Sequence, residues 1–166
     1  MKIQIIGYSG SGKSTLAKTL AQKYNLPVLH LDSVHWYGDW QQRTNEQKNQ
    51  IVEKFITENS GWVIDGNYKT VCPRRFTECN LLIFLNYNRF YCFKMAYKRY
   101  KFYKGTKRPD LPCTEKFDFE FIKWLLIDGR KKERRKALNK IAQNHNGTTL
   151  IFKNKKQLNN WLKNLK

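Results

Sequence analysis

The sequence predicts an α/β fold of three layers, in which a five-stranded parallel sheet is covered by helices on both faces. The first observation behind this prediction is the alternation of short apolar or β-branched runs with longer segments of helical periodicity. Such alternation is typical of parallel sheets built from strand–helix–strand units. The second observation is the run 81–85, which is apolar throughout, as a central parallel strand buried on both faces should be.

The strands are expected where short apolar runs stop at glycine, aspartate or other turn residues. The run 2–6 ends at Gly7, and the run 61–66 ends in an Asp-Gly turn. A strand over 28–31 is expected to end at Asp32 and to be followed by a loop rich in aromatic residues over 33–40. The remaining strands are expected at 81–85 and, after the Asn146-Gly147 turn, at 148–152.

The helices are expected where apolar residues recur every three or four positions. A polar helix is predicted from Thr44, a suitable N-cap, to Glu58. The segment 90–138 is predicted to be helical, strongly basic and aromatic, with a break at 105–109. The first helix, which ends at 25–27, and the last helix are built on these apolar positions: Leu16, Ala17, Leu20, Ala21 and Tyr24; Leu158, Trp161, Leu162 and Leu165.

Length and composition fit one domain over residues 1–166, in which residues 89–136 form a lid-like insertion. The net charge is +19, from 32 Lys and Arg against 13 Asp and Glu, and such a field attracts nucleotides, nucleic acids or anionic membranes. The four cysteines lie far apart, which favours free thiols in a reducing compartment. The longest apolar run is 81–85, too short for a membrane span, so we expect a cytoplasmic protein without a membrane partner.

A glycine-rich segment between the first strand and the first helix predicts a phosphate site. Gly7-Tyr-Ser-Gly-Ser-Gly-Lys-Ser14 satisfies the P-loop (Walker A) pattern G-x-x-x-x-G-K-[ST] in the required strand–loop–helix context. Lys13 supplies a charge for the β- and γ-phosphates of ATP, and the Ser14 hydroxyl can bind Mg²⁺. The predicted nucleotide-binding residues are Gly7, Ser9, Gly10, Ser11, Gly12, Lys13, Ser14 and Thr15.

Within the P-loop class, the sequence favours a small kinase. No Asn-Lys-x-Asp segment of a switch GTPase occurs, and the chain is short for a motor protein. Asp32 and Asp65 end two predicted strands at the edge where α/β sheets bind ligands. One could hold a water of the Mg²⁺ shell and the other could orient or deprotonate an acceptor hydroxyl. The alternatives are that Asp65 serves only the turn with Gly66 and that Asp32 caps a loop.

Further candidates lie around these carboxylates. Trp36, in an aromatic group with His35, Tyr37 and Trp40, could stack on a base or a sugar ring of the acceptor, or the group could form the hydrophobic floor under a loop. Tyr68 could reach the acceptor or could simply pack. Lid arginines that close over phosphates could be Arg99, Arg130 or Arg134. A solvated basic helix face is the alternative for each of these arginines.

Three segments carry a resemblance to a known family. Leu31-Asp-Ser-Val-His-Trp36 followed by Trp40, Trp62-Val-Ile-Asp-Gly-Asn-Tyr68, and the segment 108–124 resemble the adenylate-kinase-like FlaR-related DNA topology modulation proteins. The resemblance implies a P-loop kinase fold, with Asp65-Gly66 in the place of the Asp-Gly-Phe-Pro-Arg segment of adenylate kinases. Asn67-Tyr68 replaces Phe-Pro, and the nearest arginines are Arg74 and Arg75. Arg75 is thus the candidate for the acceptor group, and AMP is not specifically predicted.

Two functions from different classes follow. The first is a kinase that transfers the γ-phosphoryl group of ATP to a small acceptor such as a nucleoside, a nucleotide or a related metabolite, with Lys13, Asp32, Asp65, Arg99 and Arg134 as catalytic residues. The alternative is an ATP-binding regulatory protein associated with nucleic acid, favoured by the +19 charge and by aromatic residues interleaved with basic ones. A slow ATPase is a third possibility.

Overall fold

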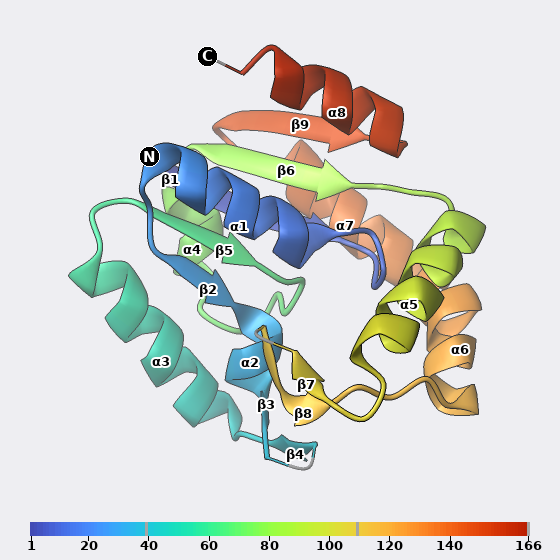
Figure 1. Ribbon diagram of the computed structural model, residues 1–166. Coiled ribbons are helices and arrows are strands. Elements are labelled where there is room, and N and C mark those ends of the chain that lie inside the picture. Colours follow the sequence, from blue (N-terminus) through green and yellow to red (C-terminus); the bar gives the residue numbers. More distant parts are fainter. Residues whose placement is uncertain (39, 109, 166) are drawn as a thin grey trace.

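The computed structural model describes residues 1–38, 40–108 and 110–165. A five-stranded sheet with the order β2–β5–β1–β6–β9 forms its centre (Figure 1). The strands are β1 (Lys2–Gly7), β2 (Val28–His30), β5 (Trp62–Asp65), β6 (Leu81–Leu85) and β9 (Thr148–Phe152). All neighbouring pairs are parallel, so the predicted fold class is confirmed.

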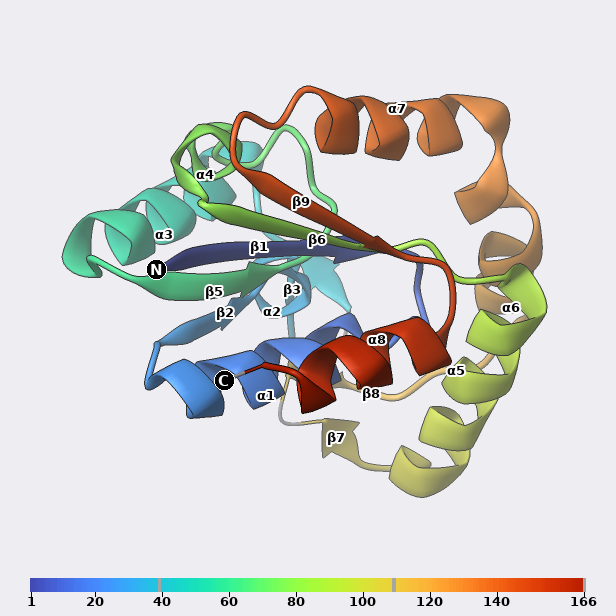
Figure 2. The ribbon, with the colours of Figure 1, turned by 90° about the horizontal axis from the view of Figure 1, so that it is seen from above.

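Helices cover both faces of this sheet. Helices α1 (Lys13–Tyr24) and α8 (Lys155–Lys163) lie on one face, while α3 (Asn45–Glu58), α4 (Arg74–Glu78) and α7 (Lys132–Gln143) lie on the other (Figure 2). The apolar side chains of the central strands are buried between these two helical layers; Ile5, Ile64 and Phe84 have no exposed surface. Burial on both faces is the physical reason why β6 is apolar throughout.

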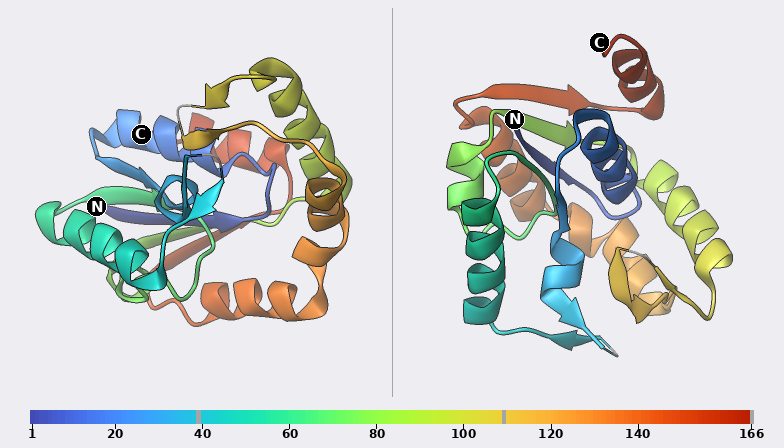
Figure 3. Two further views of the ribbon diagram at one scale, coloured as in Figure 1. Left: turned by 90° about the horizontal axis from the view of Figure 1, so that it is seen from below. Right: turned by 60° about the vertical axis from the view of Figure 1, so that its left-hand side comes forward.

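The central strands bring two functional segments to one edge of the sheet. In the parallel register, Ile5 of β1 pairs with Asp65 of β5, and Gly7 pairs with Leu85 of β6. The glycine-rich loop therefore begins beside the end of β5. Further elements follow one another around the same edge (Figure 3): α5 (Arg89–Tyr103), β7 (Lys107–Arg108), β8 (Leu111–Thr114), α6 (Phe119–Leu126) and the 3₁₀ turn η1 (Asp128–Arg130).

The structure corrects the expected strand 28–31 and the loop after it. Strand β2 ends at His30, and residues Leu31–His35 form the short helix α2. Leu31 and Val34 share one side of that turn and are 1% and 3% exposed, so burial of this pair stabilises a helical turn too short to show periodicity. The following strands, β3 (Trp36–Tyr37) and β4 (Gln41–Gln42), pair antiparallel.

The expectation that 90–138 is helical apart from a break is also wrong in one part. Strands β7 and β8 form an antiparallel hairpin in which Lys107 pairs with Thr114 and Arg108 with Leu111. Leu111 and Cys113 are buried and alternate with more exposed residues, which is strand and not helix periodicity. By contrast, Thr44 caps α3 as expected, with a reciprocal capping box to Gln47.

In the described part of the chain, no helix combines the length and the apolar character needed to cross a membrane. The four cysteines are buried as free thiols.

Candidate active site

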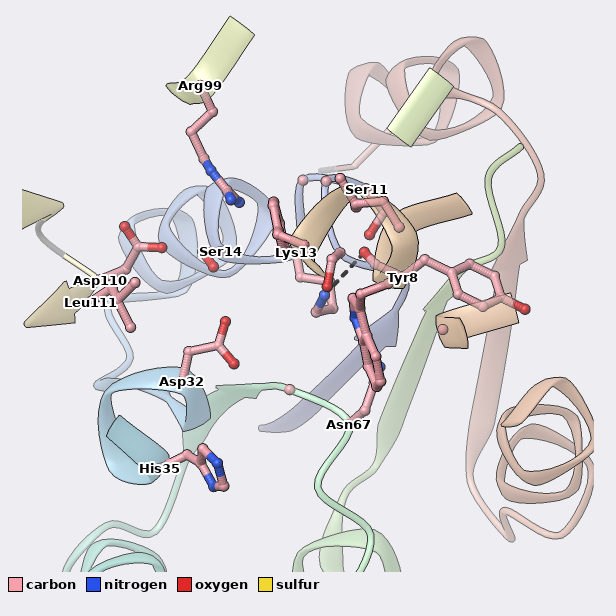
Figure 4. A pocket seen from close by; sticks show the side chains of 18 of the residues that line it. Tyr8, Ser11, Lys13, Ser14, Asp32, His35, Asn67, Arg99, Asp110 and Leu111 are labelled. Atoms are coloured by element: carbon pink, nitrogen blue, oxygen red, sulfur yellow. Dashed lines mark hydrogen bonds between the residues drawn. The ribbon is translucent and has the colours of Figure 1, made fainter. Parts of the chain in front are cut away.

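A cavity of about 1450 Å³ opens at the carboxyl edge of the sheet. Its walls come from the glycine-rich loop, α1, α2, the segment after β5, and the elements between β6 and β9. Pockets for one small ligand typically measure about 300–1,000 Å³, so this cavity can hold two small molecules. Figure 4 shows Lys13 and Ser14 between Asp32, which lies below them, and Arg99, which lies above them; Asp110 lies to the left of Ser14.

The glycine-rich loop has a backbone conformation that only glycine adopts easily. Gly12 is the N-cap of α1 and has φ 90°, and Gly10 has φ 76°. A Cβ atom on Gly10 would lie 2.2 Å from the carbonyl oxygen of Cys92 in α5, whereas a Cβ on Gly12 would meet nothing within 4 Å. The loop is therefore seated against α5 at Gly10 and faces open space at Gly12.

The loop presents a lysine and a hydroxyl next to a carboxylate. Lys13 Nζ donates to the carbonyl oxygen of Tyr8 at 3.1 Å, and in the described ranges no carboxylate lies within ion-pair distance of it. Burial lowers the pKa of Lys13, and the charges of Asp32 and Asp65 partly oppose this effect. Ser14 Oγ donates to Asp65 Oδ2 at 3.0 Å.

Asp65 is held firmly at the end of β5. Its side chain is 4% exposed, and Oδ1 lies in close contact with Nδ1 of His30. Ser14 occupies the other oxygen. Asp65 is therefore a fixed carboxylate behind the Ser14 hydroxyl. Its partner His30 does not line the cavity.

A second carboxylate, Asp32, stands on the opposite wall in the first turn of α2. Tyr68 donates its hydroxyl to Asp32 Oδ1 at 2.9 Å. Burial raises the pKa of Tyr68, and the charge of Asp32 raises it further, so the phenol stays protonated and donates. The hydrogen bond orients Asp32, and its second oxygen has no hydrogen-bond partner among the residues that the structure describes.

Aromatic side chains continue this wall. The rings of His35 and Tyr68 are stacked with centroids 4.7 Å apart. Trp36 meets His35 edge-on at 4.6 Å and Trp40 at 5.3 Å. Trp40 Nε1 donates to the carbonyl oxygen of Thr114 at 3.1 Å, so the aromatic wall is joined to the β7–β8 hairpin.

Ion pairs tie the hairpin to the neighbouring helices. Arg99 of α5 donates from Nε to Glu115 Oε1 at 2.8 Å, and Arg108 Nε lies 2.7 Å from Glu115 Oε2. Arg108 also pairs with Asp110 at 3.5 Å, and Lys18 of α1 approaches Asp110 to 3.8 Å. Burial alone would raise the pKa of Asp110, but its cationic neighbours hold it below the usual range.

Two further arginines line the cavity, and one of them contacts the glycine-rich loop. Arg130 donates to the carbonyl oxygen of Tyr87 at 2.8 Å, and its guanidinium lies 3.4 Å from the ring centroid of Tyr8. Arg134 lies over the ring of Trp124 at 4.4 Å. The structure thus brings all three candidate lid arginines, Arg99, Arg130 and Arg134, to one cavity.

The structure corrects the expectation for Arg75. This side chain has no exposed surface and does not line the cavity. It donates to the carbonyl oxygens of Val71 and Tyr68, at 3.1 and 2.8 Å. Burial lowers its pKa to about 9. Arg75 therefore fixes the loop that carries Tyr68 and is turned away from any acceptor.

Sequence reasoning missed several residues that shape the site. Asn67 donates to the carbonyl oxygen of Gly7 at 2.8 Å and accepts from its N–H at 3.0 Å, which fastens the loop to the end of β5. Its position directly after Asp65-Gly66 was a usable signal. Asp110 and Glu115 had no such signal, because the hairpin that carries them was expected to be helical.

The residues present fit a nucleoside triphosphate with Mg²⁺. The loop surrounds the N-terminus of α1, where backbone N–H groups favour anions, and the buried Oγ of Ser11 has no hydrogen-bond partner among the described residues. The open space in front of Gly12 leaves room for a phosphate. The Ser14 hydroxyl, next to the Asp65 carboxylate, is an oxygen ligand of the kind that Mg²⁺ takes beside phosphate oxygens and water.

The comparisons with known proteins agree on the fold. No family model and no curated protein matches this sequence. Among solved structures, shikimate kinase from Acinetobacter baumannii in complex with shikimate has a TM-score of 0.58 at 14% identity, over 98% of this chain and 93% of that chain. Shikimate kinase from Bacteroides thetaiotaomicron has a TM-score of 0.55 at 20% identity, over 99% and 95% of the two chains.

A third structure belongs to a kinase of another kind. Deoxyadenosine kinase from M. mycoides with bound dATP has a TM-score of 0.51 at 12% identity, over 99% of this chain and 98% of that chain. At such identities the likeness establishes the fold and no activity. The cavity at the edge of this sheet is built on the fold of small P-loop kinases.

Proposed function

We propose that this protein is an ATP-dependent kinase that phosphorylates a hydroxyl group of a small acceptor. One observation carries the proposal: the cavity has Lys13 and Ser14 on one wall, with Asp65 buried behind Ser14, and a separately oriented carboxylate, Asp32, on the facing wall. Phosphoryl transfer needs this combination of a phosphate cradle and a group that positions the acceptor. The structural neighbours, which are shikimate and deoxyadenosine kinases, support the same class of reaction.

The donor side is built from the glycine-rich loop and its supports. Backbone N–H groups at the start of α1 would bind the phosphates of ATP, and the Lys13 ammonium would interact with the β- and γ-phosphates. Asp65, buried behind Ser14, would accept hydrogen bonds from a water bound near that hydroxyl. Mg²⁺, when bound beside Ser14, supplies charge neutralisation at the phosphates.

The acceptor side is built on α2 and the segment after β5. Asp32 would accept the hydroxyl proton while the acceptor oxygen forms a bond to the γ-phosphorus. The bond from that phosphorus to the β–γ bridging oxygen breaks, and ADP leaves. Tyr68 keeps Asp32 oriented through its hydrogen bond of 2.9 Å.

Residues 89–136 would act as a lid in this proposal. Arg99, Arg130 and Arg134 line the cavity from α5, η1 and α7. Arg130 and Arg134 have no carboxylate partner among the described residues and can stabilise phosphate charge, whereas Arg99 is paired with Glu115. Closure of such a segment excludes water and favours transfer to the acceptor over hydrolysis. A cytoplasmic location and the resemblance to FlaR-related proteins belong to the same proposal.

The test is ADP formation from ATP and Mg²⁺ with a panel of hydroxyl acceptors. We expect at least one acceptor to raise ADP formation above the acceptor-free rate, and Lys13→Ala to remove this increase with a loss of about 10²–10³-fold. A background rate that no acceptor raises and that Lys13→Ala leaves unchanged would argue against a kinase. A Lys13-dependent rate with no acceptor effect would indicate a slow ATPase.

A second candidate function rests on one surface feature. Residues 131–136, at the N-terminal end of α7, are all exposed and include five lysines or arginines. This face could bind a polyanion, which is the basis for an ATP-binding regulatory protein associated with nucleic acid. Salt-dependent binding experiments, described below, separate this function from the kinase.

A further inference from the structure

The arginines that line the cavity differ in their partners. Arg99 and Arg108 are ion-paired with carboxylates, whereas Arg130 and Arg134 have no carboxylate partner in the part of the chain that the structure describes. We propose that the acceptor is an uncharged, ring-bearing hydroxyl compound of the nucleoside type, and not a phosphorylated or carboxylated compound. This inference rests on the proposed kinase function and names the acceptor class of the same site.

The hairpin that carries Arg108, with Glu115 directly after it, lies on the acceptor side of the cavity, and Arg99 reaches Glu115 from α5. The β7–β8 hairpin packs beside α2 and β3, which carry Asp32 and the aromatic wall. The hydrogen bond from Trp40 Nε1 to the Thr114 carbonyl oxygen fixes this contact. Any acceptor that approaches Asp32 therefore lies next to the hairpin and its charges.

Glu115 occupies both of these arginines. Its Oε1 lies 2.8 Å from Nε and 2.8 Å from Nη2 of Arg99, and its Oε2 lies 2.7 Å from Arg108 Nε. The side chains of Glu115 and Arg108 are 2% and 7% exposed. These are buried pairs, in which loss of one partner leaves an uncompensated charge. An acceptor phosphate would have to displace Glu115 and would also face Asp32 and Asp110.

The other cations near the acceptor do not form an anion site. Arg75, where the adenylate-kinase pattern would need an acceptor arginine, is fully buried and donates to two backbone carbonyls. Lys69 and Lys116 line the cavity, but both are exposed, so water screens their charges. The ammonium of Lys116 lies over the ring of Trp40 at 5.3 Å.

The same wall suits a flat, uncharged ring. Tyr68, His35, Trp36 and Trp40 provide a continuous series of aromatic contacts with centroid separations of 4.6–5.3 Å. Burial lowers the pKa of His35, and the charge of Lys48 lowers it further, which favours the neutral ring near pH 7. Aromatic faces beside one carboxylate that can accept a hydrogen bond from a hydroxyl group, Asp32, match a nucleoside-like molecule.

Charge on the donor side follows the opposite pattern. Arg130 Nη2 is buried without a hydrogen-bond partner among the described residues, and Arg134 contacts the face of Trp124. These guanidinium groups remain available for the phosphates of ATP. The arginines without a carboxylate partner can therefore bind one anionic molecule, ATP. In the reaction, a neutral R–OH becomes R–O–PO₃, and Asp32 accepts the hydroxyl proton.

The experiment compares matched neutral and anionic acceptors. ADP formation from Mg²⁺ and ATP is measured with the four ribonucleosides and four deoxyribonucleosides, with their 5′-monophosphates, and with shikimate as a carboxylated ring. We expect a nucleoside to exceed its own monophosphate by about tenfold or more in kcat/KM, because like charges brought together are strongly unfavourable. Binding is followed in parallel by quenching of tryptophan fluorescence.

A charge variant tests the cause of the preference. Glu115→Gln releases one of the two charges that hold Arg99 and Arg108, and we expect it to reduce the preference for the nucleoside over the monophosphate by about tenfold or more. Glu120→Gln is the matched control, since Glu120 lines the same cavity, is exposed and has no ion pair within the described residues. This control should keep the wild-type preference.

The outcomes separate this inference from the proposed function. A monophosphate or shikimate that outperforms every nucleoside overturns the inference and leaves the kinase proposal intact. Nucleosides that neither raise ADP formation nor quench fluorescence also overturn it. ATP turnover that no acceptor raises and that is the same in Lys13→Ala removes the proposed function, and the inference with it.

Discussion

Asp32 lines the cavity, whereas Asp65 is buried behind Ser14, and the two carboxylates have different partners. Asp65 is buried between Ser14 and His30, while Asp32 is bonded only to Tyr68 among the described residues. The first arrangement suits a residue that orders water next to a phosphate, and the second suits a base that receives a proton. Removal of the charge from each carboxylate is therefore expected to change a different kinetic property of the enzyme.

Substitution by asparagine tests this division. We expect Asp32→Asn to lower kcat by about 10²–10⁴-fold with little change in ATP affinity, because proton transfer by a positioned base contributes about this much. Asp65→Asn should instead raise the Mg²⁺ concentration needed for the half-maximal rate. Both are measured by ADP formation across a Mg²⁺ titration. An equal response of the two variants to Mg²⁺ would contradict the assignment.

His35 makes the stability of the folded protein depend on pH. Burial lowers its pKa below the ordinary value of 6.5, so between the two pKa values the unfolded chain holds more protons than the folded chain. The free energy of unfolding then increases with pH in this window and falls as pH drops through 6.5 towards the folded pKa. The stabilising contribution of neutral His35 is fully present above pH 6.5.

We expect the wild-type protein to lose more stability than His35→Phe between pH 7.5 and pH 5.5. Urea unfolding followed by circular dichroism at both pH values measures the difference. His30 and His145 are common to both chains, so their titration cancels in the comparison. Phenylalanine preserves the flat ring against Tyr68. A pH dependence that is the same in both chains would show that His35 titrates normally.

The glycine-rich loop is the element whose conformation decides donor binding. Gly10 and Gly12 both have positive φ, yet only Gly10 abuts another element, the Cys92 carbonyl of α5. An alanine at either position is strained by its backbone conformation, by about 1–2 kcal/mol. At Gly10 the new Cβ also collides with backbone at 2.2 Å.

Two matched alanine variants follow from this difference. We expect Gly12→Ala to lower the free energy of unfolding by about 1–2 kcal/mol, and to weaken ATP binding because its Cβ enters the phosphate space. Gly10→Ala should destabilise the protein more, since loop and α5 must separate. Urea unfolding and a fluorescent ATP analogue measure the two effects. Equal stability losses would mean that the loop is not seated on α5.

Elements with many regularly spaced apolar residues could be predicted from the sequence, and short ones could not. The five strands and the Thr44 cap of α3 were predicted because each signal is local. Helix α2 has only five residues and shows no periodicity of its own. The β7–β8 hairpin lies in a basic stretch whose composition hides the alternation of Leu111 and Cys113.

The donor half of the candidate site was predicted because its residues belong to a motif or end a strand. Lys13, Ser14 and Asp65 follow from the loop pattern and from the strand end, and the structure brings them together. Glu115 and Asp110 act through contacts with residues on α5 and α1, which sequence spacing does not reveal. Arg75 was predicted from its charge to bind the acceptor, but its side chain is fully buried and cannot contact a molecule in the cavity.

At the scale of the whole molecule, positive charge is spread well beyond the cavity. The chain carries +19, but the cavity lining contains both signs, with Asp32, Asp110, Glu115, Asp118, Glu120 and Glu133 among its residues. Three exposed basic residues of α7 do not line the cavity: Lys132, Arg135 and Lys136. Polyanion binding and phosphoryl transfer should therefore be separable.

We expect the double substitution Arg135→Glu and Lys136→Glu to weaken binding to both DNA and heparin, and to leave ATP turnover within about twofold, as is usual for surface substitutions. Wild-type binding should fall steeply between 50 and 200 mM salt, by about 10³–10⁵-fold if six to ten phosphates are contacted. Fluorescence anisotropy with a labelled single strand measures it, with heparin as competitor. A preference for DNA over heparin that persists at 150 mM salt and depends on ATP and Lys13 would instead favour the regulatory, nucleic-acid-associated function, because only then would the nucleotide site control contact with the nucleic acid.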